Sequence, residues 1–159
     1  MQVSDVKSAI ADKKNVVFLI DTSGSMETKN FEFVYPLFKD IFPINSVVEH
    51  ITCDSCLTGR WLIDRSKGEF NAHTTHTSGG GSDFERAFEI LSAEYPFGTP
   101  ILVYTDGGFS PFPIPRGIDP LSIFWLIVNG GAPHVSDCME GHVVDLDQEI
   151  KSFLVDKVQ

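Results

Sequence analysis

Three continuous apolar runs constrain what this chain can fold into. They cover residues 16–20, 101–105 and 123–128, and a polar residue follows each of them directly. A strand that is apolar without alternation is buried on both faces, which is typical of a parallel sheet. The runs therefore predict a central, mostly parallel sheet that is covered on both sides.

Weaker strand patterns complete this sheet. Residues 47–53 and 61–64 are separated by a short polar link containing Asp54, Ser55 and Gly59, which favours a hairpin. Residues 142–146 form a last short apolar pattern. Together the patterns predict six strands, of which one edge strand is antiparallel.

Helical patterns lie between the strands. Apolar residues recur at helical spacing from Phe84 to Tyr95, and again from Ile150 to Val158. Residues 4–13 suit a short helix, and residues 31–42 suit a helix that Pro36 must start or kink. Strands alternating with helices predict an α/β fold with three α-β-α layers, Rossmann-like, as a single domain over residues 1–159.

The charge balance restricts the partners. Twelve Lys and Arg residues face twenty-two Asp and Glu residues, for a net charge of −10. No basic face is visible, which argues against nucleic acid and anionic membranes and favours cations and basic protein surfaces. Three cysteines do not suggest a disulfide framework, and no apolar segment suits a signal peptide or a membrane span. We therefore expect a cytoplasmic protein.

Polar residues follow the predicted strands. Asp21 and Asp106 each come directly after an apolar run, and the glycine-rich residues 79–83 precede a predicted helix. Ligands of open parallel sheets bind outside the carboxyl ends of the strands, near the point where the strand order reverses. We expect the three loops to meet at one edge of the sheet.

The loop after the first apolar run offers oxygen ligands. It reads Asp21-Thr22-Ser23-Gly24-Ser25, with one carboxylate and hydroxyls at alternate positions. Hard oxygen donors favour Mg²⁺, Mn²⁺ or Ca²⁺ over zinc. The carboxylates of Asp21 and Asp106 would balance a divalent charge, and hydroxyls, including that of Ser82, would complete a neutral shell.

These residues resemble the von Willebrand factor A (VWA) domain family. Asp21-Thr-Ser23-Gly-Ser25 is similar to the D-x-S-x-S motif, which forms the metal-ion-dependent adhesion site (MIDAS) of that family. Two further elements match in order, Gly80-Gly81-Ser82 for the family's G-G-T and Thr105-Asp106-Gly107 for its T-D-G. The resemblance extends over about residues 15–157. Ser82 departs from the family's Thr, which implies a less restricted ligand and a lower metal affinity.

The resemblance implies a binding module rather than an enzyme. Ser23, Ser25 and Ser82 would bind Mg²⁺ directly, and Asp21 and Asp106 directly or through water. One coordination position would remain open for an Asp or Glu of a partner protein. The glycine-rich run is similar to that of intracellular VWA-like proteins of bacteria and phages, which occur beside MoxR-type AAA+ ATPases or predicted metallopeptidases. This implies an AAA+ ATPase as one partner.

Simpler interpretations of the same residues stay open. Asp21 can form an Asx turn, Asp106 can end a strand in a turn, and Ser82 can begin a capping box with Glu85. Asp83 is an alternative helix cap. The proline-rich residues 109–115 can pack over the site or against a partner, or can be a rigid loop.

Three other functions also stay open. A phosphoryl-transfer enzyme would use Asp21 as a nucleophile, although Ser23 stands where such enzymes carry a second acid. A VWA-like subunit without metal would be purely structural. The pairs Cys53-x-x-Cys56 and His73-x-x-His76 suggest zinc, although their separation is not that of a standard finger.

Overall fold

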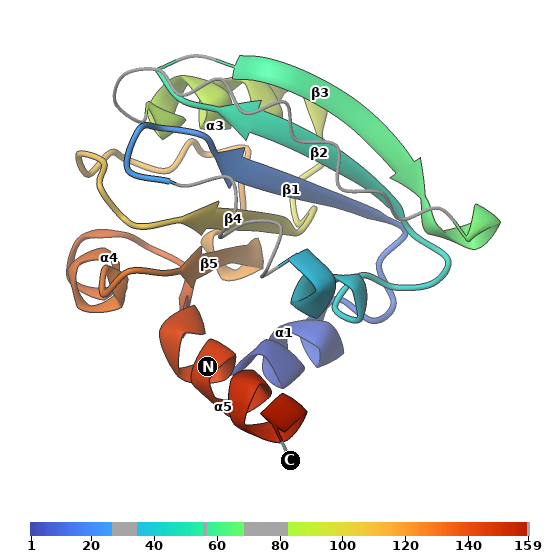
Figure 1. Ribbon diagram of the computed structural model, residues 1–159. Helices are drawn as coiled ribbons and strands as arrows, with labels where there is room; N and C mark the ends of the chain where they lie inside the picture. The colour runs from blue at the N-terminus through green and yellow to red at the C-terminus, as the bar shows by residue number, and fades with distance from the viewer. Residues whose placement is uncertain (27–34, 56, 69–82, 159) are drawn as a thin grey trace.

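The fold is a six-stranded sheet with helices on both faces (Figure 1). The computed structural model describes residues 1–26, 35–55, 57–68 and 83–158. The strands lie in the order β3-β2-β1-β4-β5-β6. All neighbouring pairs are parallel except β2 and β3. Their bounds are β1 (Asn15–Asp21), β2 (Val47–Cys53), β3 (Leu57–Asp64), β4 (Ile101–Thr105), β5 (Ile123–Ile127) and β6 (His142–Asp145). The predicted α/β class with one antiparallel edge strand is confirmed.

Strand β1 shows why an uninterrupted apolar run indicates the centre of the sheet. Its residues alternate between two hydrophobic clusters, with Phe18 and Ile20 in one and Val17 and Leu19 in the other. All four side chains are at most 1% exposed. Because both faces of the strand are covered, neither face needs polar side chains.

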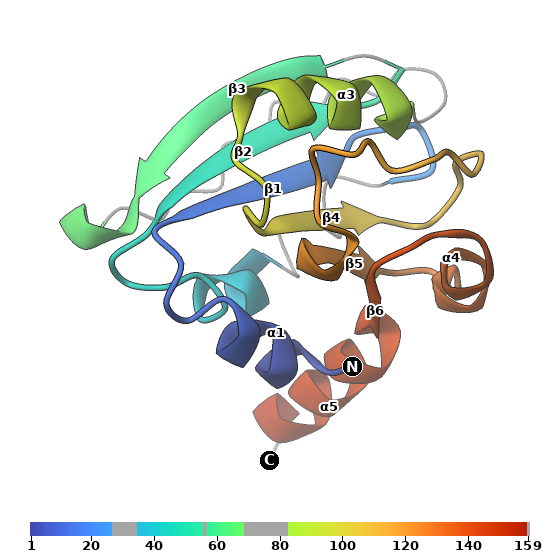
Figure 2. The same cartoon turned by 180° about the vertical axis from the view of Figure 1, so that it is seen from behind.

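Helices cover the two faces of the sheet (Figures 1 and 2). Helix α1 (Val3–Ala9), the helical residues 35–39 and α5 (Leu146–Val158) contribute to the first cluster. Helices α3 (Phe84–Glu94) and α4 (Ala132–Cys138) contribute to the second. Two short 3₁₀ helices, η1 (Arg65–Lys67) and η2 (Pro120–Ser122), follow β3 and precede β5. Within the described part of the chain, every helix is too short or too polar to cross a bilayer.

Several predicted bounds were wrong. Strand β3 begins at Leu57 rather than Trp61. A register shift beside Cys53 extends its pairing with β2, so Gly59 lies inside the strand, opposite Thr52. Helix α1 stops at Ala9 and α5 starts at Leu146. The sequence patterns missed α4 altogether, since this seven-residue helix buries only two side chains. Of the predicted helix over 31–42, residues 31–34 lie outside the described residues.

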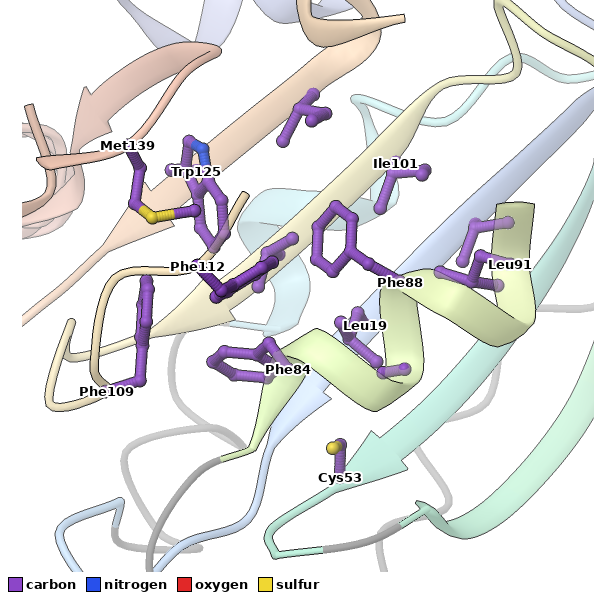
Figure 3. Packing of buried hydrophobic residues seen from close by; sticks show 14 of the residues in the cluster. Leu19, Cys53, Phe84, Phe88, Leu91, Ile101, Phe109, Phe112, Trp125 and Met139 are labelled. Carbon is purple, nitrogen blue, oxygen red and sulfur yellow. The ribbon is translucent and has the colours of Figure 1, made fainter. Parts of the chain in front are cut away.

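The connection between β4 and β5 covers the sheet without a helix. Residues 106–119 are irregular, and in Figure 2 they cross the same face as α3. Phe109 stacks on Trp125 with ring centroids 5.3 Å apart, and Phe112 contacts Phe88 at 5.3 Å (Figure 3). Both phenylalanines are at most 9% exposed. Their rings therefore belong to the core rather than to a partner surface.

The strand order reverses between β1 and β4. From β1 the chain continues outward through β2 to β3, whereas from β4 it continues in the opposite direction through β5 to β6. The two strands pair in parallel, with Ile20 opposite Tyr104. Asp21 and Thr105 therefore come next to each other at the carboxyl end, where open sheets bind their ligands.

Candidate functional site

Asp21 is the buried anchor of the candidate site. Its side chain is 2% exposed, and both carboxylate oxygens accept hydrogen bonds. The Ser23 main-chain N–H donates to Oδ1 at 2.8 Å, and the Thr105 hydroxyl donates to Oδ2 at 2.6 Å. The first bond is the predicted Asx turn, and the second ties β1 to β4. Asp21 thus holds the loop that follows it against the neighbouring strand.

The two serines of this loop face each other. Their hydroxyl oxygens lie 3.2 Å apart, with Ser23 buried and Ser25 exposed. The Met26 N–H closes the turn onto the Ser23 carbonyl at 2.9 Å, and the Met26 side chain is buried in the core. Adjacent ligands in an octahedral Mg²⁺ shell, with bonds of about 2.0–2.1 Å, lie about 2.9 Å apart. The two hydroxyls form a hydrogen bond with each other, and their spacing is somewhat longer than that of two neighbouring ligands.

Asp106 differs from Asp21 in its exposure. Its side chain is half-buried, and Oδ1 accepts the Gly108 N–H at 3.0 Å. Glycines determine the path of its main chain. Gly107 has a φ of +81° and lies against Val135, and a Cβ on Gly131 would stand 1.9 Å from the Asp106 carbonyl oxygen. The loop after β4 therefore depends on two close contacts that larger residues would prevent.

Acidic groups gather at this edge. Burial raises the pKa of the Tyr104 hydroxyl, and the charges of Asp147, Asp21 and Asp106 raise it further. Asp147, on α5, accepts the main-chain N–H groups of Asn129 and Gly130 at 3.1 and 2.8 Å. Three carboxylates from separate parts of the chain thus act on one buried side chain. An edge of this charge favours a cation.

Helix α3 begins beside the same edge. The Asp83 N–H donates to the Asp54 carbonyl at 2.7 Å, just beyond β2, and β2 pairs with β1 at Asp21. Because α3 starts at Phe84, the N-cap position belongs to Asp83 rather than to Ser82, and the Asp83 side chain makes no capping bond. Ser82 itself lies outside the described residues.

The predicted zinc ligands are only partly described. The Cys53 thiol is buried and lies 3.6 Å from the carbonyl oxygens of Asp54 and Asp83. Cys56, His73 and His76 lie outside the described residues. In the described ranges, no three His, Cys, Asp or Glu side chains are grouped so as to hold a metal ion.

Thr105 is the residue whose role sequence reasoning missed. Its side chain is fully buried, and its hydroxyl both donates to Asp21 and accepts the Gly107 N–H at 3.2 Å. Its place in the Thr-Asp-Gly element was the available signal. No family model matches this sequence, and no curated protein matches it.

Proposed function

We propose that this chain is a VWA-type protein-binding module that uses Mg²⁺ at the strand ends to bind a carboxylate of a partner protein. The observation that carries the proposal is the pair of facing hydroxyls of Ser23 and Ser25. They lie on a loop held by the buried Asp21, which accepts a hydrogen bond from Thr105, the residue before the half-buried Asp106. This set of oxygens occurs where the strand order reverses.

The described residues fit a hard divalent cation. Ser23, Ser25 and Asp106 would hold it, and Asp21 would contribute negative charge and keep the serine loop in position. Ser82 is included as a ligand because of its place in the Gly80-Gly81-Ser82 element. When bound, Mg²⁺ supplies positive charge and a coordination position for an external oxygen, since it keeps several exchangeable waters. Mn²⁺ and Ca²⁺ take the same oxygen ligands.

A phosphoryl-transfer enzyme is less well supported. Its nucleophile would be Asp21, but this carboxylate is 2% exposed and both of its oxygens already accept hydrogen bonds. A nucleophile must instead reach the reacting atom. A binding role makes use of the same burial, because a carboxylate held in this way keeps the loop ready to bind. The AAA+ ATPase remains the partner class that the family resemblance implies.

Metal binding is the first test. The metal-free protein is titrated with Mg²⁺, Mn²⁺ and Ca²⁺ by calorimetry and thermal unfolding, alongside Ser25→Ala and Asp106→Asn. Wild type should gain about 2.7 kcal/mol of stability at a hundredfold excess over the dissociation constant, and both variants should gain far less. Ser136→Ala and Asp137→Asn, which change exposed residues of α4, are matched controls. Equal responses in all five proteins would contradict the proposal.

Carboxylate recognition is the second test. Fluorescent peptides with a central Glu are compared with otherwise identical Gln peptides, with and without Mg²⁺. Binding should require both the Glu and the metal, and it should disappear in Ser25→Ala. If Mg²⁺ binds but Glu and Gln peptides behave alike, the metal site survives and the carboxylate mechanism fails. If no metal binds, the module without metal becomes the better description.

A further inference from the structure

The opposite edge of the sheet carries a cavity with the reverse charge. It measures about 570 Å³ and is lined by residues of α1, the loop before β1, the loop before β2, and η1, at the amino ends of β1 and β2. Four basic residues and two acidic ones are among those that line it: Lys7, Lys13, Lys14, Arg65, Asp12 and Asp40. The whole chain has only twelve basic residues against twenty-two acidic ones. A third of its positive charge thus lies around one cavity.

Main-chain hydrogen bonds hold the walls of this cavity together. Ser46 is fully buried, and both its N–H and its hydroxyl donate to the Pro43 carbonyl, at 3.1 and 2.6 Å. The Arg65 N–H donates to the Ser46 carbonyl at 2.9 Å, and the Val47 N–H donates to the Lys14 carbonyl at 2.8 Å. Three segments far apart in sequence therefore meet at one point. The cavity is formed before any ligand arrives, which lowers the entropic cost of binding.

The chemistry of the lining indicates the ligand. Two net positive charges favour a dianion, and ammonium and guanidinium groups are the usual partners of phosphate oxygens. The rim also carries an apolar side chain, Ile44, which is 73% exposed. The volume lies within the range of small-ligand sites, about 300–1,000 Å³.

We propose that this cavity binds a small organic phosphate of about nucleotide size. Its phosphate would lie among Lys7, Lys14 and Arg65, and its organic part would lie against Ile44. The site is separate from the strand-end loops and does not depend on the function proposed for them.

The test uses ADP as the probe and adenosine as its uncharged counterpart, in metal-free buffer at low salt. Binding is followed by calorimetry and by amide NMR shifts. ADP should shift the amides of residues 11–14 and 44–46, and adenosine should not. Lys7→Glu/Lys14→Glu should lower the affinity at least about tenfold, because it reverses two charges at the cavity. Arg86→Glu/Lys151→Glu makes the same change of net charge at exposed sites elsewhere and should alter the affinity by less than about twofold.

Four results would overturn the proposal. The first is that wild type does not bind ADP at low salt. The second is that adenosine binds as tightly as ADP. The third is that the two double variants lose affinity equally while thermal unfolding shows both to be folded. The fourth is that the NMR shifts fall on residues 23–26 instead. A Glu-rich peptide that binds the cavity when ADP does not would assign this surface to an acidic protein segment.

Discussion

Asp21 and Asp106 lie at the carboxyl ends of neighbouring strands of one sheet, yet they differ in burial and in their hydrogen-bond partners. Asp21 is buried, and its two oxygens accept hydrogen bonds from Ser23 and Thr105. Asp106 is half-buried, and its side chain accepts the amide of Gly108, two residues on. One carboxylate joins two strands, whereas the bond that the other accepts among the described residues closes its own turn. Two residues that look equivalent in the motif therefore have different physical roles.

The difference separates stability from binding. Removal of a buried carboxylate is costly. The groups that donated hydrogen bonds to it lose their acceptor, and they cannot bond to water instead because they are buried. A half-exposed carboxylate can exchange protein contacts for water or for a ligand at little cost. The comparison predicts that changes at Asp21 act on folding and that changes at Asp106 act on the ligand.

The largest effect on stability is expected from a substitution that displaces the main chain of Asp106. Gly131→Ala would place a Cβ 1.9 Å from the Asp106 carbonyl oxygen, so the loop after β4 or the one after β5 must shift. We expect a loss of about 3 kcal/mol in the free energy of unfolding, measured in urea. Gly24→Ala is the control, since no atom of the described residues lies within 4 Å of its added Cβ. A Gly131→Ala protein as stable as Gly24→Ala would contradict the packing described for this loop.

Removal of the buried carboxylate should have the next largest effect. Asp21→Ala leaves the Thr105 hydroxyl and the Ser23 N–H without their acceptor, which should cost about 2–3 kcal/mol in urea unfolding. Thr105→Val removes the bond to Asp21 together with the bond that the Thr105 hydroxyl accepts from the Gly107 N–H, but it keeps the Ser23 bond to Asp21, so it should also lower the stability. If Asp21→Ala unfolds at the same urea concentration as wild type, the carboxylate does not join the two strands.

Mild acid should lower the stability through a different buried group, the imidazole of His50. His50 on β2 is fully buried against Trp61 and accepts or donates a bond to the Tyr35 hydroxyl at 2.9 Å. Burial lowers the pKa of His50 to about 4, below its ordinary 6.5. The unfolded chain therefore binds the proton first, so stability is complete above pH 6.5 and falls as the pH drops toward 4.

The expected loss is about 1 kcal/mol between pH 6.5 and 5.5, above the range in which ordinary carboxyl groups titrate. His50→Gln should lose less across the same interval, as measured by urea unfolding at each pH. An identical pH dependence in the two proteins would mean that another group is responsible.

The smallest effect on stability is expected at Asp106. Asp106→Ala should change the free energy of unfolding by less than about 0.5 kcal/mol, as for other changes away from the core. The same variant should lose most of its response to Mg²⁺ in thermal unfolding. A large loss of stability without metal would show that Asp106, like Asp21, is structural.

Local patterns were sufficient to predict much of the fold. The apolar runs indicated the buried strands, because residues 16–20 supply both hydrophobic clusters and leave no polar face. The motif also located Asp21 and Asp106 at strand ends, since a polar residue after a buried strand must lie at the edge of the sheet. Both inferences depend on residues close together in sequence.

Only the tertiary structure decided what each of these residues does. The burial of Asp21 depends on Thr105, 84 positions later, and the position of Asp106 depends on its contact with Gly131. Phe109 and Phe112 proved to be core residues because Trp125 and Phe88 lie beneath them. The basic cavity likewise joins Lys7, Lys14 and Arg65 from separate segments. A local pattern records which face of a strand or helix is apolar. Which distant residue lies opposite is determined by how the elements pack.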